Sequence, residues 1–260
     1  MIYEYDGTLA GLWSAYETAL RGDLRPDDFL PPGAPGGCGL FDRPVPLVTD
    51  FSLTEAFGQR LRAAGEAVPG EFVRVFLAEA PGGERLMFRT CLKVTEAGGR
   101  VRGHLADPDI RRFQELVRKV GSETHRYKGL LRFEELEDGL LWASFQPQYN
   151  VSVLLAAHFR SRLPHERWLI CDVGRGTALH YDGRTTAAVE LDAAVLTELR
   201  TRGRLPGRTA ASDPYAEYWR RFFRAVAIGD RINPGLQRQF MPERLWKWLP
   251  EKVPSDLAGR

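Results

Sequence analysis

Two histidines and an aspartate have the side chains and the sequence settings that general acid–base chemistry needs: His125, His158 and Asp172. His125 opens the run HRYK (125–128), whose cations either hold a phosphate or lower the pKa of the imidazole so that it acts as a base. The alternative is a histidine on a surface loop. His158 follows two leucines at spacings of three and four, so it lies on an apolar helix face, as a pocket-lining group or as a satisfied core histidine. The catalytic assignment therefore stays open among these three.

Basic residues gather in two stretches, which is typical of proteins that bind a polyanion. Between Arg200 and Lys252 there are 12 basic and 5 acidic residues. Between Arg111 and Arg132 there are seven basic and two acidic residues. Arginine outnumbers lysine 31 to 5, which suits bidentate phosphate contacts but also follows from a GC-rich genome. A helix is predicted from Asp213 to Ile228, and the arginines on its outer face are either a phosphate-contacting stripe or a solvated charged face. The candidate contacts from these stretches are Arg126, Lys128, Arg132, Arg220, Arg224 and Arg238.

The segment NPGLQRQFMPERLWKWLP (233–250) mixes basic and aromatic residues close to the C-terminal end of the sequence. A helical turn starting at Pro234 is predicted to point Leu236 and Phe240 inward. A second turn, from Pro242, is predicted to bury Leu245, Trp248 and Leu249 against the aromatic helix that precedes this segment. We therefore expect the apolar side of this segment to close the fold and its polar side, with Arg238, to meet a polyanion.

The cysteines argue against a metal centre in this chain. Cys38, Cys91 and Cys171 lie far apart and form no CxxC pair, so no iron–sulfur cluster or structural zinc site is predicted. Three buried thiols in a reducing compartment are the expected arrangement. No cofactor is predicted.

Several other functional classes are also disfavoured by the sequence. It contains no GxxxxGK[ST] loop, no GxGxxG between a strand and a helix, no GxSxG elbow and no HExxH pair. The Asp213-Pro214-Tyr215 run resembles a motif of uracil-DNA glycosylases, but here it caps an aromatic helix and no His-Pro-Ser accompanies it. The opening MIYEYDG lacks the features of a signal peptide and no apolar run is long enough to cross a membrane, so a cytoplasmic protein is expected.

The elements that would position these side chains begin with a strand over 1–5 and a helix that Thr8 caps. A Gly/Pro-rich loop over 22–46 and a helix from Thr54 to Ala64 follow. Residues 71–95 are predicted to form two helical pieces that separate at Pro81-Gly82-Gly83. This N-terminal third, residues 1–104, is either a separate domain or part of one continuous domain.

The remaining residues, 105–260, are predicted to form an α+β core. A helix starts at Asp107-Pro108 and ends at Gly121. Two hairpins turn at 137–139 and 174–176, and the order hairpin, helix, hairpin, helix indicates a mainly antiparallel sheet with helices packed on it and a helical C-terminal region. The predicted elements are strands 127–136, 140–146, 168–173, 178–181 and 185–191, a helix from Asn150 to Leu163, a helix from Asp213 to Ile228, and turns at Pro234 and Pro242.

Three blocks of the chain resemble a bacterial family of unknown function whose members are described as DNA repair or DNA metabolism proteins. The blocks are HRYKGLLRFEEL (125–136), AAHFRSRLPHERWLICDVGRG (156–176) and NPGLQRQFMPERLWKWLPE (233–251), and the opening YDGT (5–8) is also similar. Members usually have methionine where Tyr127 stands, and Arg-Tyr-Trp where this chain has Arg244-Leu245-Trp246. The positions that match the recurring polar residues of the family are His125, Arg126, Lys128, Arg132, His158, Asp172, Arg175, Gln237 and Arg238.

The resemblance implies partners and leaves two functions open. Family members are commonly encoded beside a radical SAM protein that modifies or repairs DNA, and similar domains are fused to uracil-DNA glycosylase-like domains. The favoured function is a nucleic-acid-binding accessory protein that binds DNA, with RNA not excluded, and acts with that radical SAM partner. Arg175 and Gln237 join the nucleic-acid contacts on this ground. The alternative is an enzyme on nucleic acid or nucleotides that uses His125 or His158 with Asp172.

Overall fold

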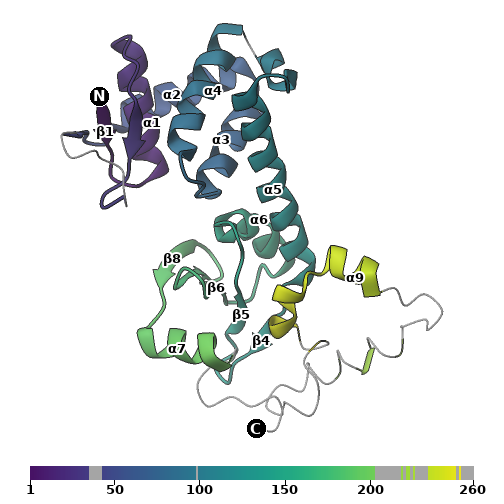
Figure 1. Cartoon of the computed structure of the whole chain (residues 1–260). Coiled ribbons are helices and arrows are strands. Elements are labelled where there is room, and N and C mark those ends of the chain that lie inside the picture. The colour runs from purple at the N-terminus through teal and green to yellow at the C-terminus, as the bar shows by residue number, and fades with distance from the viewer. Residues whose placement is uncertain are drawn as a thin grey trace. The chain divides into compact units, whose positions relative to one another are not determined.

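The computed structural model describes residues 1–34, 43–97, 99–202, 218, 221–222, 225, 234–249 and 252. The chain divides into two compact units, Met1–Gly121 and Ser122–Arg260. Both helices and sheets are present, so the predicted α+β class is confirmed (Figure 1).

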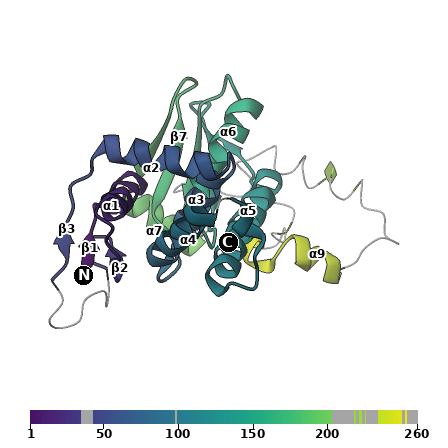
Figure 2. The same cartoon turned by 90° about the horizontal axis from the view of Figure 1, so that it is seen from above.

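The N-terminal unit is mainly helical. Its helices are α1 (Leu9–Arg21), α2 (Phe51–Ala64), α3 (Val68–Leu77), α4 (Gly83–Ala97), the 3-10 helix η1 (Gly99–Gly103) and the first part of α5 (Pro108–Leu130). Thr8 caps α1 as predicted, because its Oγ1 accepts a hydrogen bond from the Gly11 N–H at 3.0 Å. The split between α3 and α4 also falls where the Pro81-Gly82-Gly83 run predicted it. Figure 2 shows α1 beside α2.

Aromatic side chains form the core of this unit. Tyr16 has no exposed surface and contacts Phe29 edge-on, with the ring centroids 4.7 Å apart. Phe57 and Phe88 lie 5.4 Å from the same ring. Buried aromatic pairs of this kind contribute both apolar area and a preferred geometry. Three helices, α1, α2 and α4, and the residue Phe29 from the segment 28–30 are thereby fixed around one tyrosine.

A small parallel sheet lies in the N-terminal unit as well. β1 (Ile2–Glu4) is the central strand, between β2 (Asp28–Leu30) and β3 (Val45–Pro46). The sequence pattern predicted β1, but it assigned β2 and β3 to the long loop, since strands of two or three residues leave little periodicity. Helix α1 provides the crossover that a parallel pair requires between β1 and β2.

The C-terminal unit contains a five-stranded sheet in the order β4-β5-β6-β7-β8. Its strands are β4 (Glu134–Glu135), β5 (Leu141–Phe145), β6 (Trp168–Asp172), β7 (Thr177–Tyr181) and β8 (Thr186–Glu190). The pairs β4/β5, β6/β7 and β7/β8 are antiparallel, which confirms the mainly antiparallel sheet and both predicted hairpins. β5 and β6 are parallel. Their crossover contains α6 (Ser152–Arg162), which contacts β6 and β7.

The last three helical elements of the described chain differ in how well the sequence predicted them. α7 (Ala193–Arg202) was not predicted, although Asp192 provides a cap by accepting the Ala194 N–H at 2.8 Å. Turns from Pro234 and Pro242 were predicted, and they are α9 (Pro234–Phe240) and the 3-10 helix η4 (Glu243–Trp248). The start of the helix predicted from Asp213 lies outside the described residues. The Asn150 cap is wrong, because Val151 precedes α6 as the cap residue and makes no side-chain cap bond.

Helix α5 is longer than predicted, because it does not end at Gly121. Gly121 lacks the positive φ of a helix-ending glycine. Buried positions continue past it at helical spacing, with Glu123 and Tyr127 on the stripe that began before it. The predicted strand is therefore wrong over residues 127–130, where the chain is still helical, and its strand portion is β4 alone. The apolar period, and not the glycine, determines where this helix ends.

Gly121→Ala is accordingly expected to raise the free energy of unfolding by about 0.5–1 kcal/mol, the usual gain for glycine to alanine inside a helix. A Cβ at this position would have no neighbour within 4 Å. Urea denaturation followed by circular dichroism measures the change. Gly139→Ala is the control and should destabilise, since Gly139 has φ +76°. A destabilised Gly121→Ala would contradict a continuous α5.

Candidate nucleic-acid interface

A buried carboxylate organises the loop that follows β5 in the C-terminal unit. Glu123, 3% exposed, accepts the N–H groups of Gln148 at 3.1 Å and Tyr149 at 2.8 Å. Its Oε1 also accepts a hydrogen bond from Nη2 of Arg244 at 2.9 Å. We call residues 146–150 the β5–α6 loop. Glu123 therefore joins α5, this loop and η4 with one side chain.

Other side chains hold the same loop. The Tyr127 hydroxyl donates to the Gln146 carbonyl at 3.2 Å, and Nζ of Lys247 donates to the Gln146 side chain at 2.9 Å. Arg175 donates to the Gln148 carbonyl at 3.2 Å. Gln146 and Gln148 nevertheless stay exposed. The loop thus combines a fixed backbone with exposed amide side chains, which is the arrangement that binding sites on loops require.

Asp172 and Arg175, both predicted site residues, lie together at the turn after β6. The Asp172 carboxylate is fully buried, and its Oδ1 accepts the N–H groups of Gly174 and Arg175. Its Oδ2 contacts Nη1 of Arg175 at 2.9 Å. Burial raises the pKa of Asp172, and the Arg175 guanidinium opposes that rise. Within the described part of the chain its hydrogen-bond partners include no histidine, so Asp172 fixes a turn.

His158 lies on α6 as predicted, in a setting that suits a structural histidine. Its ring is edge-on to Phe159 with the centroids 4.8 Å apart, and it bonds the backbone of Lys128. Burial lowers the pKa of His158, and the cations Lys128 and Arg162 lower it further. Nε2 is buried and, among the described residues, has no hydrogen-bond partner. The lowered pKa favours the neutral ring, and the nitrogen that could act on a substrate is buried.

The predicted residues of the HRYK run lie on the last turns of α5 rather than at a strand entrance. His125 is exposed there, while Arg126 and Lys128 are half-buried. Arg132 follows the helix and its Nη1 donates to the Gly129 carbonyl at 2.9 Å, so it helps to cap the C-terminal end of α5. The end of α5 is thereby basic, as the charge count predicted.

The C-terminal segment brings cations and indoles together. Nζ of Lys247 lies 4.5 Å from the centre of the Trp248 ring, and Nζ of Lys252 lies 4.6 Å from Trp246. Burial lowers the pKa of Lys247. Arg238 is 60% exposed and pairs with Glu243 at 2.9 Å. Such an exposed pair contributes little to stability, so a phosphate can replace Glu243 at small cost.

The apolar part of this segment was predicted only in part. Leu245 and Leu249 are buried as expected, whereas Trp248 is half-buried, and all three line a small cavity with Tyr127 and Phe145. Most of the aromatic helix that was expected to cover them lies outside the described residues. Phe240 is 65% exposed, so its predicted inward orientation is wrong. It is the last residue of α9. Gln237 is half-buried on the same helix. Arg220 and Arg224 lie outside the described residues.

Sequence reasoning missed Glu123, whose carboxylate accepts hydrogen bonds from Gln148, Tyr149 and Arg244. A signal was present: Glu123 continues the stripe of Phe113, Leu116 and Val120, all buried. A carboxylate on an apolar stripe indicates a buried partner. Ending the helix at Gly121 hid that spacing.

Among the described residues, no group of three or more His, Cys, Asp or Glu side chains could hold a metal ion. Cys91 and Cys171 are free and buried as predicted, and burial raises the pKa of Cys91 to about 12. Cys38 lies outside the described residues. None of the described helices has the length and apolar character that crossing a bilayer demands.

The C-terminal unit thus defines an α+β protein with a fixed loop between basic helical segments. The model of a family designated as a domain of unknown function, DUF4130, matches residues 81–251, so the chain belongs to this family. The blocks 125–136, 156–176 and 233–251 fall inside the match, and the opening YDGT lies outside it. No curated protein and no solved structure has significant similarity to the chain.

Proposed function

We propose that this chain is a nucleic-acid-binding accessory protein that acts in DNA repair or DNA modification beside a radical SAM protein. The observation that carries the proposal is the β5–α6 loop, whose exposed Gln146 and Gln148 lie beside the cations Lys247 and Arg175. Exposed amides on a fixed loop backbone, flanked by basic side chains, are suited to contact bases and phosphates. Trp246 and Trp248 add indole rings beside Lys252 and Lys247.

The settings of two of the three candidate catalytic residues, His158 and Asp172, favour a non-catalytic role. Nε2 of His158 is buried, and Arg175 occupies the Asp172 carboxylate. The resemblance of blocks 125–136, 156–176 and 233–251 to a DNA-metabolism family supports DNA as the ligand. It also supports a radical SAM protein as the partner, with a uracil-DNA glycosylase-like protein as a second partner. The widely spaced cysteines suit a division of labour in which the partner carries the iron–sulfur chemistry.

The double variant Arg238→Gln/Lys247→Gln is expected to weaken binding and to lower the salt slope of log K by about 2, because each lost phosphate contact contributes about 0.9. Fluorescence anisotropy of the full chain with single-stranded, double-stranded and uracil-containing DNA, and with RNA, from 50 to 300 mM salt measures this. The melting temperature should stay nearly constant.

The matched control is Arg25→Gln/Arg62→Gln, which removes two arginines from exposed ion pairs of the N-terminal unit. It should leave the salt slope unchanged. Absence of binding to all four nucleic acids, or equal slopes for the two double variants, would refute the proposed interface. Repeating the titrations with the radical SAM protein tests the accessory role.

A further inference from the structure

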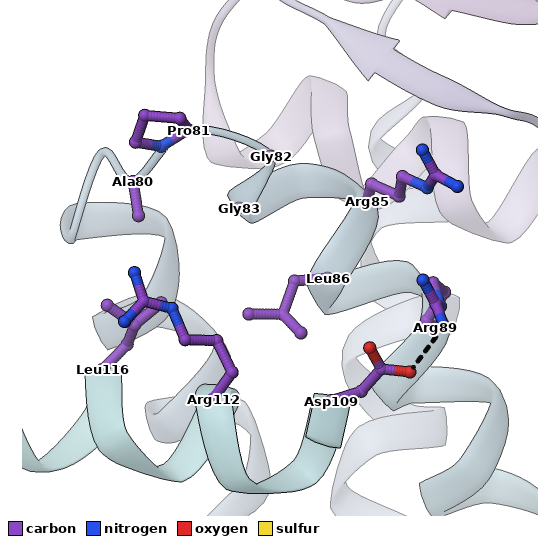
Figure 3. A pocket seen from close by; sticks show the side chains of 10 residues that line it. All are labelled: Ala80, Pro81, Gly82, Gly83, Arg85, Leu86, Arg89, Asp109, Arg112 and Leu116. Atoms are coloured by element: carbon purple, nitrogen blue, oxygen red, sulfur yellow. Dashed lines mark ion pairs between the residues drawn. The ribbon is translucent and has the colours of Figure 1, made fainter. Parts of the chain in front are cut away.

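The N-terminal unit carries a hollow of about 360 Å³ between the start of α4 and the first turns of α5 (Figure 3). The turn Ala80–Gly83 forms one rim, and Leu86 and Leu116 provide its apolar part. A Cβ built on Gly82 or Gly83 would meet nothing within 4 Å. The backbone of this turn is therefore open to a ligand, and the volume is in the range of small-molecule sites.

Three arginines and one carboxylate provide the charge of the hollow: Arg85, Arg89, Arg112 and Asp109. Arg85 and Arg89 lie four residues apart on α4, so they emerge on the same face. Arg112 comes from α5 and projects towards the Ala80 side of the hollow (Figure 3). The excess of positive charge predicts an anionic ligand.

On the α4 side of the hollow, Arg89 can leave its ion pair with Asp109 and bind another anion. Nη2 of Arg89 lies 3.0 Å from Oδ2 of Asp109, but Nζ of Lys93 lies 2.6 Å from the same oxygen. Asp109 therefore keeps a positive partner if Arg89 turns to another anion. Arg89 itself is 51% exposed, so its pairing contributes little.

The α5 side repeats this arrangement. Nη1 of Arg112 lies 3.3 Å from Oε2 of Glu115, and Lys119 contacts Oε1 of Glu115 at 2.7 Å. Glu115 thus keeps Lys119, and Asp109 keeps Lys93, which it shares with Asp107. Arg89 and Arg112 lie on opposite sides of the hollow (Figure 3), so each can turn towards a phosphate without leaving its carboxylate unpaired. Arginine is the side chain best suited to bidentate phosphate contacts.

We propose that this hollow binds a phosphorylated nucleotide, with the phosphate at the arginines and the nucleoside against Leu86, Leu116 and the Ala80–Gly83 turn. The nucleotide is either free or the phosphorylated end of a strand. This site lies wholly in the N-terminal unit, so it does not depend on the interface proposed for the C-terminal unit. The residues from Pro81 onwards belong to the family match.

Isothermal titration calorimetry of the full chain with dAMP, deoxyadenosine and inorganic phosphate tests the site. We expect dAMP to bind at least tenfold more tightly than either of the other two. Arg89→Gln/Arg112→Gln should weaken dAMP binding tenfold or more, and Arg112→Gln alone about threefold. A hexathymidylate with and without a 5′-phosphate distinguishes the sources: tighter binding of the phosphorylated strand, lost in Arg89→Gln/Arg112→Gln, assigns a strand end, and equal binding of the two strands assigns a free nucleotide.

Arg62→Gln is the matched control, because Arg62 is 52% exposed and pairs with a surface glutamate as Arg112 does. It should bind dAMP as the wild type does, and so should Arg238→Gln/Lys247→Gln. Thermal melts verify that the variants fold. No dAMP binding at millimolar concentration, equal weakening by the control, or dAMP affinity no higher than that of phosphate would overturn the proposal.

Discussion

Glu123→Ala is expected to lower the stability of the C-terminal unit by about 2–4 kcal/mol, because a buried carboxylate and its hydrogen bonds to two backbone N–H groups are lost. The substitution leaves the N–H groups of Gln148 and Tyr149 without an acceptor and removes the partner of Arg244. Each unpaired buried N–H group adds to the loss. Hydrogen–deuterium exchange of peptides that cover residues 146–151 provides the most direct measurement, because these amides should lose their protection.

The control lies on the same helix. Glu115 is 40% exposed and pairs with Lys119, so Glu115→Ala should change stability by about 0.5 kcal/mol or less. Arg244→Ala should fall between the two, since the Arg244 side chain is 46% exposed. Unchanged protection of the loop in Glu123→Ala would show that Glu123 does not hold it. Loss of nucleic-acid binding in the same variant would link loop rigidity to the proposed function.

Glu17→Gln is expected to destabilise the N-terminal unit by about 3 kcal/mol, because it uncouples a buried carboxylate from two arginines. The Glu17 side chain is 3% exposed, and Arg60 contacts both of its oxygens at 3.0 Å. Nε of Arg21 adds a third contact at 3.0 Å. Urea denaturation of wild type and variant at pH 7 measures the difference, and Glu55→Gln, at an exposed ion pair, is the control.

The same residue predicts a pH dependence. Burial by itself raises the pKa of Glu17, but hydrogen bonds from Arg60 and Arg21 outweigh it, and the pKa lies below the ordinary value of 4.5. The unfolded chain therefore binds more protons than the folded chain in this range. The contribution of Glu17 is complete above pH 4.5 and is lost as the pH falls through the folded-state pKa. The stability difference between wild type and Glu17→Gln should shrink from pH 7 to pH 3, and a constant difference would contradict this account.

Local features of the chain were readable from the sequence. The cap at Thr8 and the turns at Gly139 and Gly176 depend on one side chain or on one glycine with positive φ, at +76° and +71° in these turns. Such features need only neighbouring residues, so a short window of sequence contains their cause. The α+β class, the hairpins and the burial of Leu245 follow from patterns of the same range.

The site was decided by tertiary structure. Glu123 and Arg244 are 121 positions apart, and no pattern within a window relates them. The parallel pairing of β5 with β6 and the exposure of Phe240 likewise depend on which surfaces meet after folding. The length of α5 was partly readable from the sequence. Its apolar spacing continues past Gly121, but the glycine by itself predicted that the helix ends there. The sequence by itself determined the class, the hairpins and the basic stretches of this protein. Only the tertiary structure decided which charged side chains are buried in ion pairs and which are exposed to a ligand. The physical reason is that burial depends on groups distant in the chain.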